Sequence, residues 1–370
     1  MAGSTFGNIF KITTWGESHG KGVGVVVDGC PAGLSLCEED IQKFLDRRKP
    51  GQSKFTTPRK EDDAVEILSG VFEGKTTGTP ISLIVFNHNQ QSKDYSEIAS
   101  YYRPGHADYT FDAKYGFRDY RGGGRSSGRE TIGRVAAGAI AVKILNQLGI
   151  SFLTYAKSIG PIQISAGNFD ADAISKNPVY MPDIDAAENA MAYLEACIAE
   201  QNSSGGVVEC IIKGVPAGIG DPVFEKLNAN LAKAVMSIGA VKGFEIGDGF
   251  DVAKATGKNN NDAFRMSEND SVVKTTNHAG GILGGISDGS DIILRATIKP
   301  TPSISATQQT VNKAGKEIDI NIKGRHDPII VPRAVVVVES MAAIAIVDAL
   351  FSNMSARMDA VEQFYSKTGV

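Results

Sequence analysis

A basic, glycine-rich segment from Arg103 to Arg134 constrains this chain more than any other feature of its sequence. The segment holds six arginines and one lysine against four acids, although the whole protein carries a net charge of −4. At its centre the run Gly122–Gly124 leads into Arg125–Ser127, and apolar residues at helical spacing follow as far as Leu145. Glycine loops that enter arginine-rich helix N-termini are typical of phosphate sites. Any one of these arginines could simply be solvated, but seven cations in so short a segment favour an anion site.

A second basic cluster follows a short predicted helix near the N-terminus. Ser35 and Glu38 have the S-x-x-E spacing of a capping box, as do Ser127 and Glu130 in the first segment. Pro50-Gly51 would end the helix. Solvation again is the alternative, but we expect both clusters to face one polyanionic ligand. The cluster contains no acid, and its cations are Arg47, Arg48, Lys49, Lys54, Arg59 and Lys60.

Composition excludes several classes of protein. Apolar residues make up 42% of the 370-residue chain and charged residues 22%, as in soluble globular proteins. The net charge of −4 gives no general attraction for nucleic acid or anionic membranes. The first residues do not resemble a signal peptide, and we expect no stretch long enough to span a membrane. Because the four cysteines lack C-x-x-C spacing, we expect reduced core cysteines and a cytoplasmic protein.

Three sequence echoes in the same order indicate an internal duplication. The segment 29–34 (GCPAGL) resembles 214–219 (GVPAGI), and glycines at 70, 74 and 78 match those at 281, 285 and 289. The alanine-rich segment 136–141 has a counterpart at 341–346. We therefore predict one pseudo-symmetric domain over residues 1–370, with repeat halves of roughly 1–150 and 205–350.

Hydrophobic periodicity predicts the remaining elements. Strands are expected at 22–29, 81–86, 206–214 and 334–338, and helices at 185–201, near 222–237 and at 341–350. The polar segment 257–270 reads as a mobile loop.

Four of the five histidines lie in glycine-rich loops, where backbone can approach a ligand closely. No histidine pair has metal-ligand spacing, so we expect no metal. No Walker lysine loop or G-x-S-x-G elbow appears. What remains is a phosphorylated ligand with histidines able to move protons near neutral pH. The four are His19, His106, His278 and His326.

Long motifs in the chain resemble the signature blocks of the chorismate synthase family. They run in one order from the N-terminus to about residue 350, without large insertions, and are highly specific. The motifs are 16–20 (GESHG) continuing to 28–31 (DGCP), 103–108 (RPGHAD), 124–131 (GRSSGRET), 277–281 (NHAGG), and 325–328 (RHDP) continuing to 339–341 (ESM).

The resemblance implies a fold, a reaction and a cofactor. Family members have an α+β fold, a β-α-β sandwich with helices between two antiparallel sheets, and form homotetramers. They are carbon–oxygen lyases that convert 5-enolpyruvylshikimate 3-phosphate to chorismate by anti-1,4-elimination of phosphate, a step of aromatic amino acid biosynthesis. They require reduced FMN without net redox change. We expect a monofunctional enzyme supplied by an external flavin reductase, with NADPH as the source of electrons if it reduces FMN itself.

The resemblance also implies residue roles. His19 would protonate the departing phosphate, His106 would stabilise the reduced flavin near N1, and Asp327 would assist deprotonation at N5. Ser18 and Ser127 would support them; from the residues alone, Asp327 reads as a turn cap before Pro328. FMN would be bound by Arg125, Ser126, Ser127, Gly239, Ala240, Gly284, Lys299, Pro300, Thr301, Pro302, Ser303 and Arg325, a nicotinamide nucleotide by Arg48 and Lys54, and the substrate by Arg48, Arg129 and Arg134.

Two positions depart from the family pattern. Lys54 replaces an arginine and loses the bidentate fork that would hold a phosphate. Gly239 replaces an asparagine and keeps only backbone contacts.

Two other functions fit part of the sequence. An arginine- and glycine-rich module that binds RNA or another anion would explain the basic loop but not the histidine loops, and the acidic net charge opposes it. A structural assembly protein would explain the duplication but would leave both basic clusters without a role.

Overall fold

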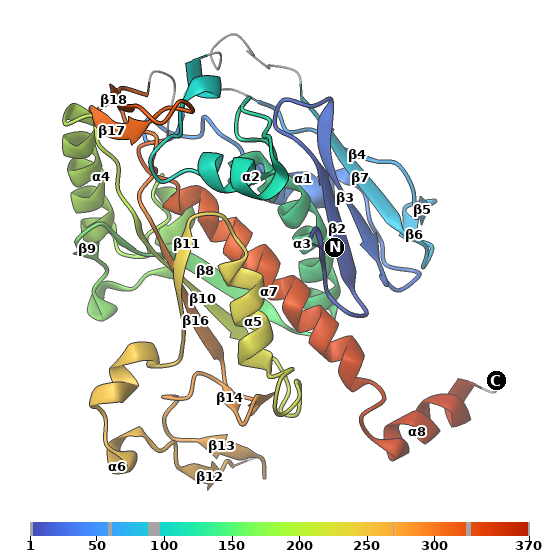
Figure 1. Ribbon diagram of the computed structural model, residues 1–370. Helices are drawn as coiled ribbons and strands as arrows, with labels where there is room; N and C mark the ends of the chain where they lie inside the picture. The colour runs from blue at the N-terminus through green and yellow to red at the C-terminus, as the bar shows by residue number, and fades with distance from the viewer. Residues whose placement is uncertain (1–2, 58–60, 88–96, 269, 323–326, 369–370) are drawn as a thin grey trace.

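Two five-stranded antiparallel sheets enclose a layer of helices (Figure 1). The computed structural model describes residues 3–57, 61–87, 97–268, 270–322 and 327–368. The expected α+β sandwich is confirmed. The first sheet contains β1 (Thr5–Phe6), β2 (Lys11–Gly16), β3 (Gly22–Asp28), β7 (Ile81–Phe86) and β4 (Val65–Ile67), and the second contains β9 (Ile162–Gln163), β8 (Ser151–Ile159), β10 (Gly206–Lys213), β16 (Ile292–Ile298) and β11 (Val241–Ile246), each in this spatial order.

The two sheets repeat one topology. Four strands correspond in both chain order and spatial order, β2-β3-β7-β4 in the first sheet and β8-β10-β16-β11 in the second, whereas the edge strands differ because β1 precedes β2 and β9 follows β8. In each repeat a helix follows the second of these strands and a longer helix follows the third strand in this spatial order. A two-residue-strand hairpin precedes that third strand. These elements are α1 (Glu38–Arg48) and α5 (Leu227–Met236), α3 (Thr131–Gln147) and α7 (Val331–Asn353), and the hairpins β5–β6 (Val71–Phe72, Lys75–Thr76) and β14–β15 (Ile282–Leu283, Ile286–Ser287).

The glycines at 29 and 214 explain one of the sequence echoes. Gly29 follows β3 with a φ of +78°, and a Cβ there would lie 1.9 Å from the carbonyl oxygen of Ile9. Gly214 follows β10 with a φ of +83°, and a Cβ there would lie 2.4 Å from the carbonyl oxygen of Gly149. Both positions need glycine because the backbone entering the neighbouring strand passes too close for a side chain.

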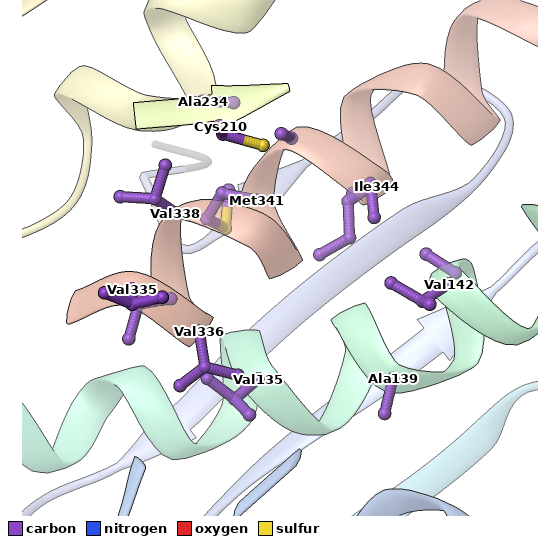
Figure 2. Close-up of a cluster of buried hydrophobic side chains, with 14 of the residues drawn as sticks. Val135, Ala139, Val142, Cys210, Ala234, Val335, Val336, Val338, Met341 and Ile344 are labelled. Atoms are coloured by element: carbon purple, nitrogen blue, oxygen red, sulfur yellow. The ribbon is translucent and has the colours of Figure 1, made fainter. Parts of the chain in front are cut away.

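The central helices α3 and α7 pack against each other in one core that both sheets share. Figure 2 shows α7 between Val135 of α3 on one side and Cys210 of β10 on the other. The close approach depends on Gly138, where a Cβ would lie 2.2 Å from the Cβ of Ser340. The single-domain organisation over residues 1–370 stays a prediction.

The strand expected at 334–338 is wrong, because this segment is the start of α7. Val335–Val338 are all buried, so the helix is apolar on every side. A valine loses less than about 0.7 kcal/mol of helix propensity, whereas burying its side chain is worth about 1.5–3 kcal/mol. Packing therefore overrides the β-branched composition.

Helix α7 also corrects the expectation that no segment could span a membrane. Its 23 residues are long and apolar enough to do so, and the mean hydropathy of its most apolar window is 2.2. However, 78% of the most apolar window is buried inside the fold. Length and composition of this kind are shared by core helices of soluble proteins, and α7 occupies the centre of the helical layer.

Other boundaries differ from the expectations in smaller ways. The helix expected at 185–201 is α4 (Ile184–Ala199), whereas α5 begins five residues later than expected. Helix α1 is capped by Cys37 with Asp40 rather than by Ser35 with Glu38. Cys37 is therefore exposed, while Cys30, Cys197 and Cys210 are free, buried core residues as expected.

The segment 257–270, expected to be a mobile loop, contains regular structure outside residue 269. It forms α6 (Gly257–Asn260) and β12 (Phe264–Met266), which pairs with β13 (Val272–Lys274). Its anchor is Asp262, whose carboxylate accepts hydrogen bonds from the backbone N–H groups of His278 and Ala279. Lys274 Nζ donates to Asp262 at 3.2 Å and to Asp288 at 2.7 Å, and all three side chains are buried. Polar composition thus reflects a buried ion network rather than disorder.

Candidate active site

The connections from β7 to α3 and from β16 to α7, which correspond in the two repeats, meet at one end of the molecule. Figure 1 shows α2 (Asp108–Tyr115) and the hairpin β17–β18 (Gln308–Val311, Glu317–Ile320) at the same end as the N-terminus of α7. The Tyr102 N–H donates to the Val311 carbonyl, and Lys299 Nζ donates to the Gly105 carbonyl at 2.6 Å. Most of the expected site residues lie in these connections or beside them.

His19 and Ser18 lie in the turn between β2 and β3, and both are more than nine-tenths buried. Ser18 Oγ is 3.1 Å from His19 Nδ1 and donates to the Gly122 carbonyl at 3.3 Å. Gly122 has a φ of +62°, and a Cβ there would lie 2.2 Å from the His19 Cε1 atom. The first glycine of the triplet is therefore needed to seat the imidazole, and the sequence-distant segments 16–20 and 122–124 are in contact.

Arg48 and Arg129 share one buried carboxylate, Asp63. Arg48 Nη1 donates to Asp63 Oδ2 at 2.6 Å, and Arg129 Nη1 donates to Asp63 Oδ1 at 3.0 Å. Arg48 also donates to Thr131 Oγ1 and to the Gly128 carbonyl, at the start of α3. Burial lowers the pKa of Arg48 to about 10 and raises the pKa of Asp63, so for each group desolvation outweighs attraction. Each group supplies the other's counter-charge, which opposes the effect of burial on both.

Sequence reasoning missed Asp63. It stands directly after the second basic cluster, in an acidic Glu61–Asp63 run that offered the available signal. Nothing local distinguishes it from Asp62, which is exposed. Its backbone φ of +47° is strained for a non-glycine residue and turns the side chain inward.

Asp327 is held from two sides. Arg333 Nη1 donates to Asp327 Oδ2 at 2.7 Å, and the Thr57 N–H donates to Oδ1 at 2.7 Å. Arg333 Nε also donates to the Arg48 carbonyl at 2.9 Å, which links Asp327 to the buried arginine. The predicted residues Arg325 and His326 lie outside the described residues, as do Arg59 and Lys60.

His106 lies beside the expected phosphate cup. Its Nε2 atom is 2.8 Å from Ser303 Oγ. The loop that carries it is held by Asp108, whose carboxylate accepts both Nε and Nη2 of Arg103 at 2.8 Å. Burial opposes ionisation of Asp108, but its bonds to Arg103 outweigh this and lower its pKa.

The arginines of the basic, glycine-rich segment 103–134 mostly form hydrogen bonds or ion pairs within the protein. Arg125 donates to the Thr14 and Gly16 carbonyls. Arg134 donates to Glu130 Oε2 at 2.8 Å and to Ser237 Oγ at 2.6 Å. The others pair with carboxylates: Arg103 with Asp108, Arg118 with Asp112, Arg121 with Asp119 and Arg129 with Asp63. The segment is therefore a charge-compensated frame rather than an open basic patch.

The predicted capping box at Ser127 forms only in part. Ser127 Oγ accepts the Arg129 N–H at 3.3 Å and caps a 3₁₀ turn (Gly128–Glu130) that leads into α3. Glu130 instead accepts Thr14 Oγ1 at 2.9 Å and pairs with Arg134. The carboxylate joins β2 to α3, which local spacing could not predict.

The expected FMN residues fall into two places. The Lys299 N–H donates to the Ala240 carbonyl, so 239–240 and 299–303 adjoin, and a Cβ on Gly239 would meet open space. Thr301 Oγ1 is buried and has no hydrogen-bond partner among the described residues. Lysine, threonine and serine donors in this arrangement fit a phosphate group. Gly284, however, precedes β16 while Lys299 follows it, and seven strand residues span about 23 Å.

Lys54 also stands apart. It is two-thirds exposed and pairs with Glu195 of α4, so it does not join the buried Arg48–Asp63 pair. Ser126 Oγ donates to the Gly123 carbonyl at 2.7 Å and so stabilises the glycine loop.

A polar cavity of about 250 Å³ adjoins this network between the C-terminus of α1 and the N-terminus of α7. Arg47 and Arg333 contribute to its wall, but none of the residues expected to be catalytic does. Within the described ranges no three His, Cys, Asp or Glu side chains are grouped to hold a metal ion.

Comparisons with known proteins agree on one family. Residues 10–351 match the family model described as chorismate synthase. A chorismate synthase of Agathobacter rectalis is 75% identical over 367 residues, covering 99% of this chain and 100% of that protein. One from Methanosarcina mazei is 55% identical, covering 94% and 96%. A crystal structure of chorismate synthase aligns with a TM-score of 0.77 at 30% identity, covering 98% of both chains.

Proposed function

Because the chain belongs to the chorismate synthase family, a family of lyases, we propose that the site described above eliminates phosphate from 5-enolpyruvylshikimate 3-phosphate with the help of reduced FMN. One observation links this reaction to the site: the structure contains a hydrogen-bonded Ser18–His19 pair, and Arg48 and Arg129 are both held by the buried carboxylate of Asp63. Loss of phosphate needs a proton donor and fixed positive charge at the leaving group. This arrangement supplies both.

In the proposed mechanism His19 donates a proton to the departing phosphate. Ser18 Oγ orients the imidazole through Nδ1, and the backbone of Gly122 packs against the edge of the ring. Arg48, Arg129 and Arg134 provide the positive charge, and their protein partners hold them before substrate arrives. Preorganised charge of this kind needs no reorganisation as the bond breaks.

We propose that FMN is held by Arg125–Ser127, Gly239–Ala240 and Lys299–Ser303. Burial and the neighbouring Lys242 lower the pKa of Lys299, which an incoming phosphate would reverse. When bound, reduced FMN would lend an electron that helps phosphate leave and would recover it as the ring hydrogen departs. His106, oriented by Ser303, would hold a proton near flavin N1, and Asp327, which Arg333 holds in place, would assist deprotonation at flavin N5. Arg325 would join this set from outside the described residues.

We propose that reduced FMN reaches the enzyme from an external reductase. Lys54 replaces the family arginine and already pairs with Glu195 on the surface, which disfavours a tight nicotinamide phosphate site there with Arg48. The free cysteines fit the cytoplasmic location that such a supply requires.

We propose that the chain forms the family's homotetramer. Two projecting elements expose large apolar side chains: β12–β13, with Phe264, Met266 and Val272, and α8 (Met358–Thr368), with Phe364. Exposed apolar groups gathered in this way are typical of interfaces. Light scattering of F264S/M266S is expected to show a smaller assembly than the wild type, while Lys254→Ala, an exposed neighbour, should leave it unchanged.

The test of the function is anaerobic turnover with FMN and dithionite, following chorismate absorbance and phosphate release. The wild type should turn over and His106→Ala should not. A folded, flavin-loaded wild type that forms no chorismate would refute the assignment. Replacing dithionite by NADPH then decides between an external and an intrinsic reductase: we expect no turnover.

A further inference from the structure

Asn87, the residue that follows β7, joins two parts of the site. Its backbone N–H donates to the Lys21 carbonyl at 3.0 Å, which extends the pairing of β7 with β3 by one residue. Its side-chain Nδ2 donates to the Glu17 carbonyl at 3.0 Å and to the Gly20 carbonyl at 2.9 Å. These two bonds close the turn that carries Ser18 and His19.

The oxygen of the same amide holds an arginine. Arg129 Nε donates to Asn87 Oδ1 at 2.9 Å. The amide therefore uses both of its N–H groups and its oxygen, and the partners fix which atom is which: two carbonyls need donors, and an arginine N–H needs an acceptor.

The connection continues into the buried core of the site. Arg129 reaches Asp63, and Asp63 reaches Arg48, through bonds of 3.0 and 2.6 Å. The Asp63 side chain has no exposed surface, so its two oxygens cannot move without breaking a buried ion pair. One hydrogen-bonded chain thus runs from the histidine turn to both arginines through segments far apart in the sequence.

We infer that Asn87 is a positioning residue that sets His19 against Arg129, so that the proton donor and the phosphate-binding charge approach the leaving group together. The inference rests on the proposed function of His19 and Arg129. An amide is required because a carboxylate would place oxygen against two carbonyl oxygens. Displacing a reacting group by about 1 Å can cost a hundredfold in rate.

Asn87→Asp separates the two contacts of the side chain: it removes the donors to the Glu17 and Gly20 carbonyls and keeps an acceptor for Arg129. The substituted oxygen can still accept from Arg129, so the KM for substrate is expected to stay within about threefold of the wild type. The turn loses its two donors, so kcat is expected to fall by about tenfold or more. A merely structural asparagine would lower stability without this split between kcat and KM.

Asn177 provides a matched control. Its Nδ2 also donates to two carbonyls, those of Ala173 and Met181, both at 2.8 Å, but no proposed catalytic or binding residue is among its partners. Asn177→Asp is expected to lower the melting temperature at least as much as Asn87→Asp and to leave kcat unchanged.

The outcomes are distinct. If the wild type makes no chorismate, the proposed function fails. If the wild type makes chorismate and the kcat of Asn87→Asp stays within threefold of the wild-type value, or if only its KM rises, the inference about Asn87 is wrong while the function stands. Should Asn87→Asp not fold, Asn87→Ser, which is small and uncharged, is judged by the same criterion.

Discussion

Arg48 Nη1 lies 2.6 Å from Asp63 Oδ2, and neither side chain is more than 2% exposed. A pair this deeply buried is weak evidence for stability in itself, because desolvation offsets the attraction. The pair instead fixes the positions of side chains: Asp63 also binds Arg129, so one carboxylate orients two arginines of the proposed site.

Asp63→Ala should destabilise the fold strongly. The substitution leaves Arg48 charged and unpaired in the interior, which typically costs about 3–5 kcal/mol. Urea unfolding at pH 7 measures the loss. Asp46→Ala removes an exposed partner of Lys49 and should cost less than about 1 kcal/mol. Equal losses in the two variants would show that the burial of the Arg48–Asp63 pair has no energetic consequence.

Gly122→Ala should abolish most activity. The added methyl would overlap the His19 ring, with 2.2 Å to Cε1, and displace the proposed proton donor. We expect kcat to fall by about a hundredfold, the scale of a 1 Å misplacement.

Gly116→Ala is the control for backbone strain. Gly116 has a φ of +79°, close to that of Gly122, but a Cβ there meets no atom within 4 Å. It should cost about 1–2 kcal/mol of stability and leave kcat unchanged. Similar kinetics in the two variants would contradict the steric explanation.

Gly138→Ala should lower stability although alanine favours helices. Helix propensity alone predicts a gain of about 1 kcal/mol in the middle of α3. The methyl would instead collide with Ser340 and push α3 from α7, at a typical cost of about 1–3 kcal/mol or more. Ser340→Gly in the same chain should recover part of the loss in thermal unfolding. A stabilised Gly138→Ala variant would mean that the helices can separate freely.

Thiol labelling should distinguish Cys37 from the other three cysteines. Burial raises the pKa of Cys30 to about 11 and that of Cys210 to about 12, so their thiolates are scarce and inaccessible at pH 8. Only Cys37 should react in the native protein, and all four after denaturation. Its pKa is raised by a bond with Glu39, so its labelling rate should keep increasing above pH 9.

The raised pKa values of Cys30 and Cys210 also predict how the stability of the protein depends on pH. A thiol whose pKa is higher in the folded state contributes stability below the unfolded value of about 8.5 and loses it as pH rises towards the folded value. Unfolding free energy should therefore decline between about pH 8.5 and 12, and by less in Cys210→Ala than in the wild type, each measured against its own value at pH 7. An equal decline in both would show that Cys210 does not contribute.

Features encoded by near neighbours could be predicted from the sequence. The repeated glycine turns at 29–34 and 214–219 require positive φ beside a passing strand, and from them the sequence predicts an internal duplication; the two sheets share the order of four strands. The glycine loop before α3 and the motifs that resemble one family also depend on local order. The sequence alone therefore places residues 18, 19, 106 and 122 in functional loops, but not the contacts between them.

Long-range pairing was decided by the tertiary structure. Arg47 and Arg48 are adjacent, yet Arg47 reaches Glu339 on α7 while Arg48 is buried against Asp63. Likewise Val335–Val338 carry a strand composition and form a helix, because α7 is surrounded by apolar neighbours. Periodicity and turn chemistry act over a few residues, whereas desolvation and ion pairing depend on which distant segments exclude water together. The sequence by itself determined the repeats and the reactive residue types, and only the packing of the two repeats decided which charges became a site.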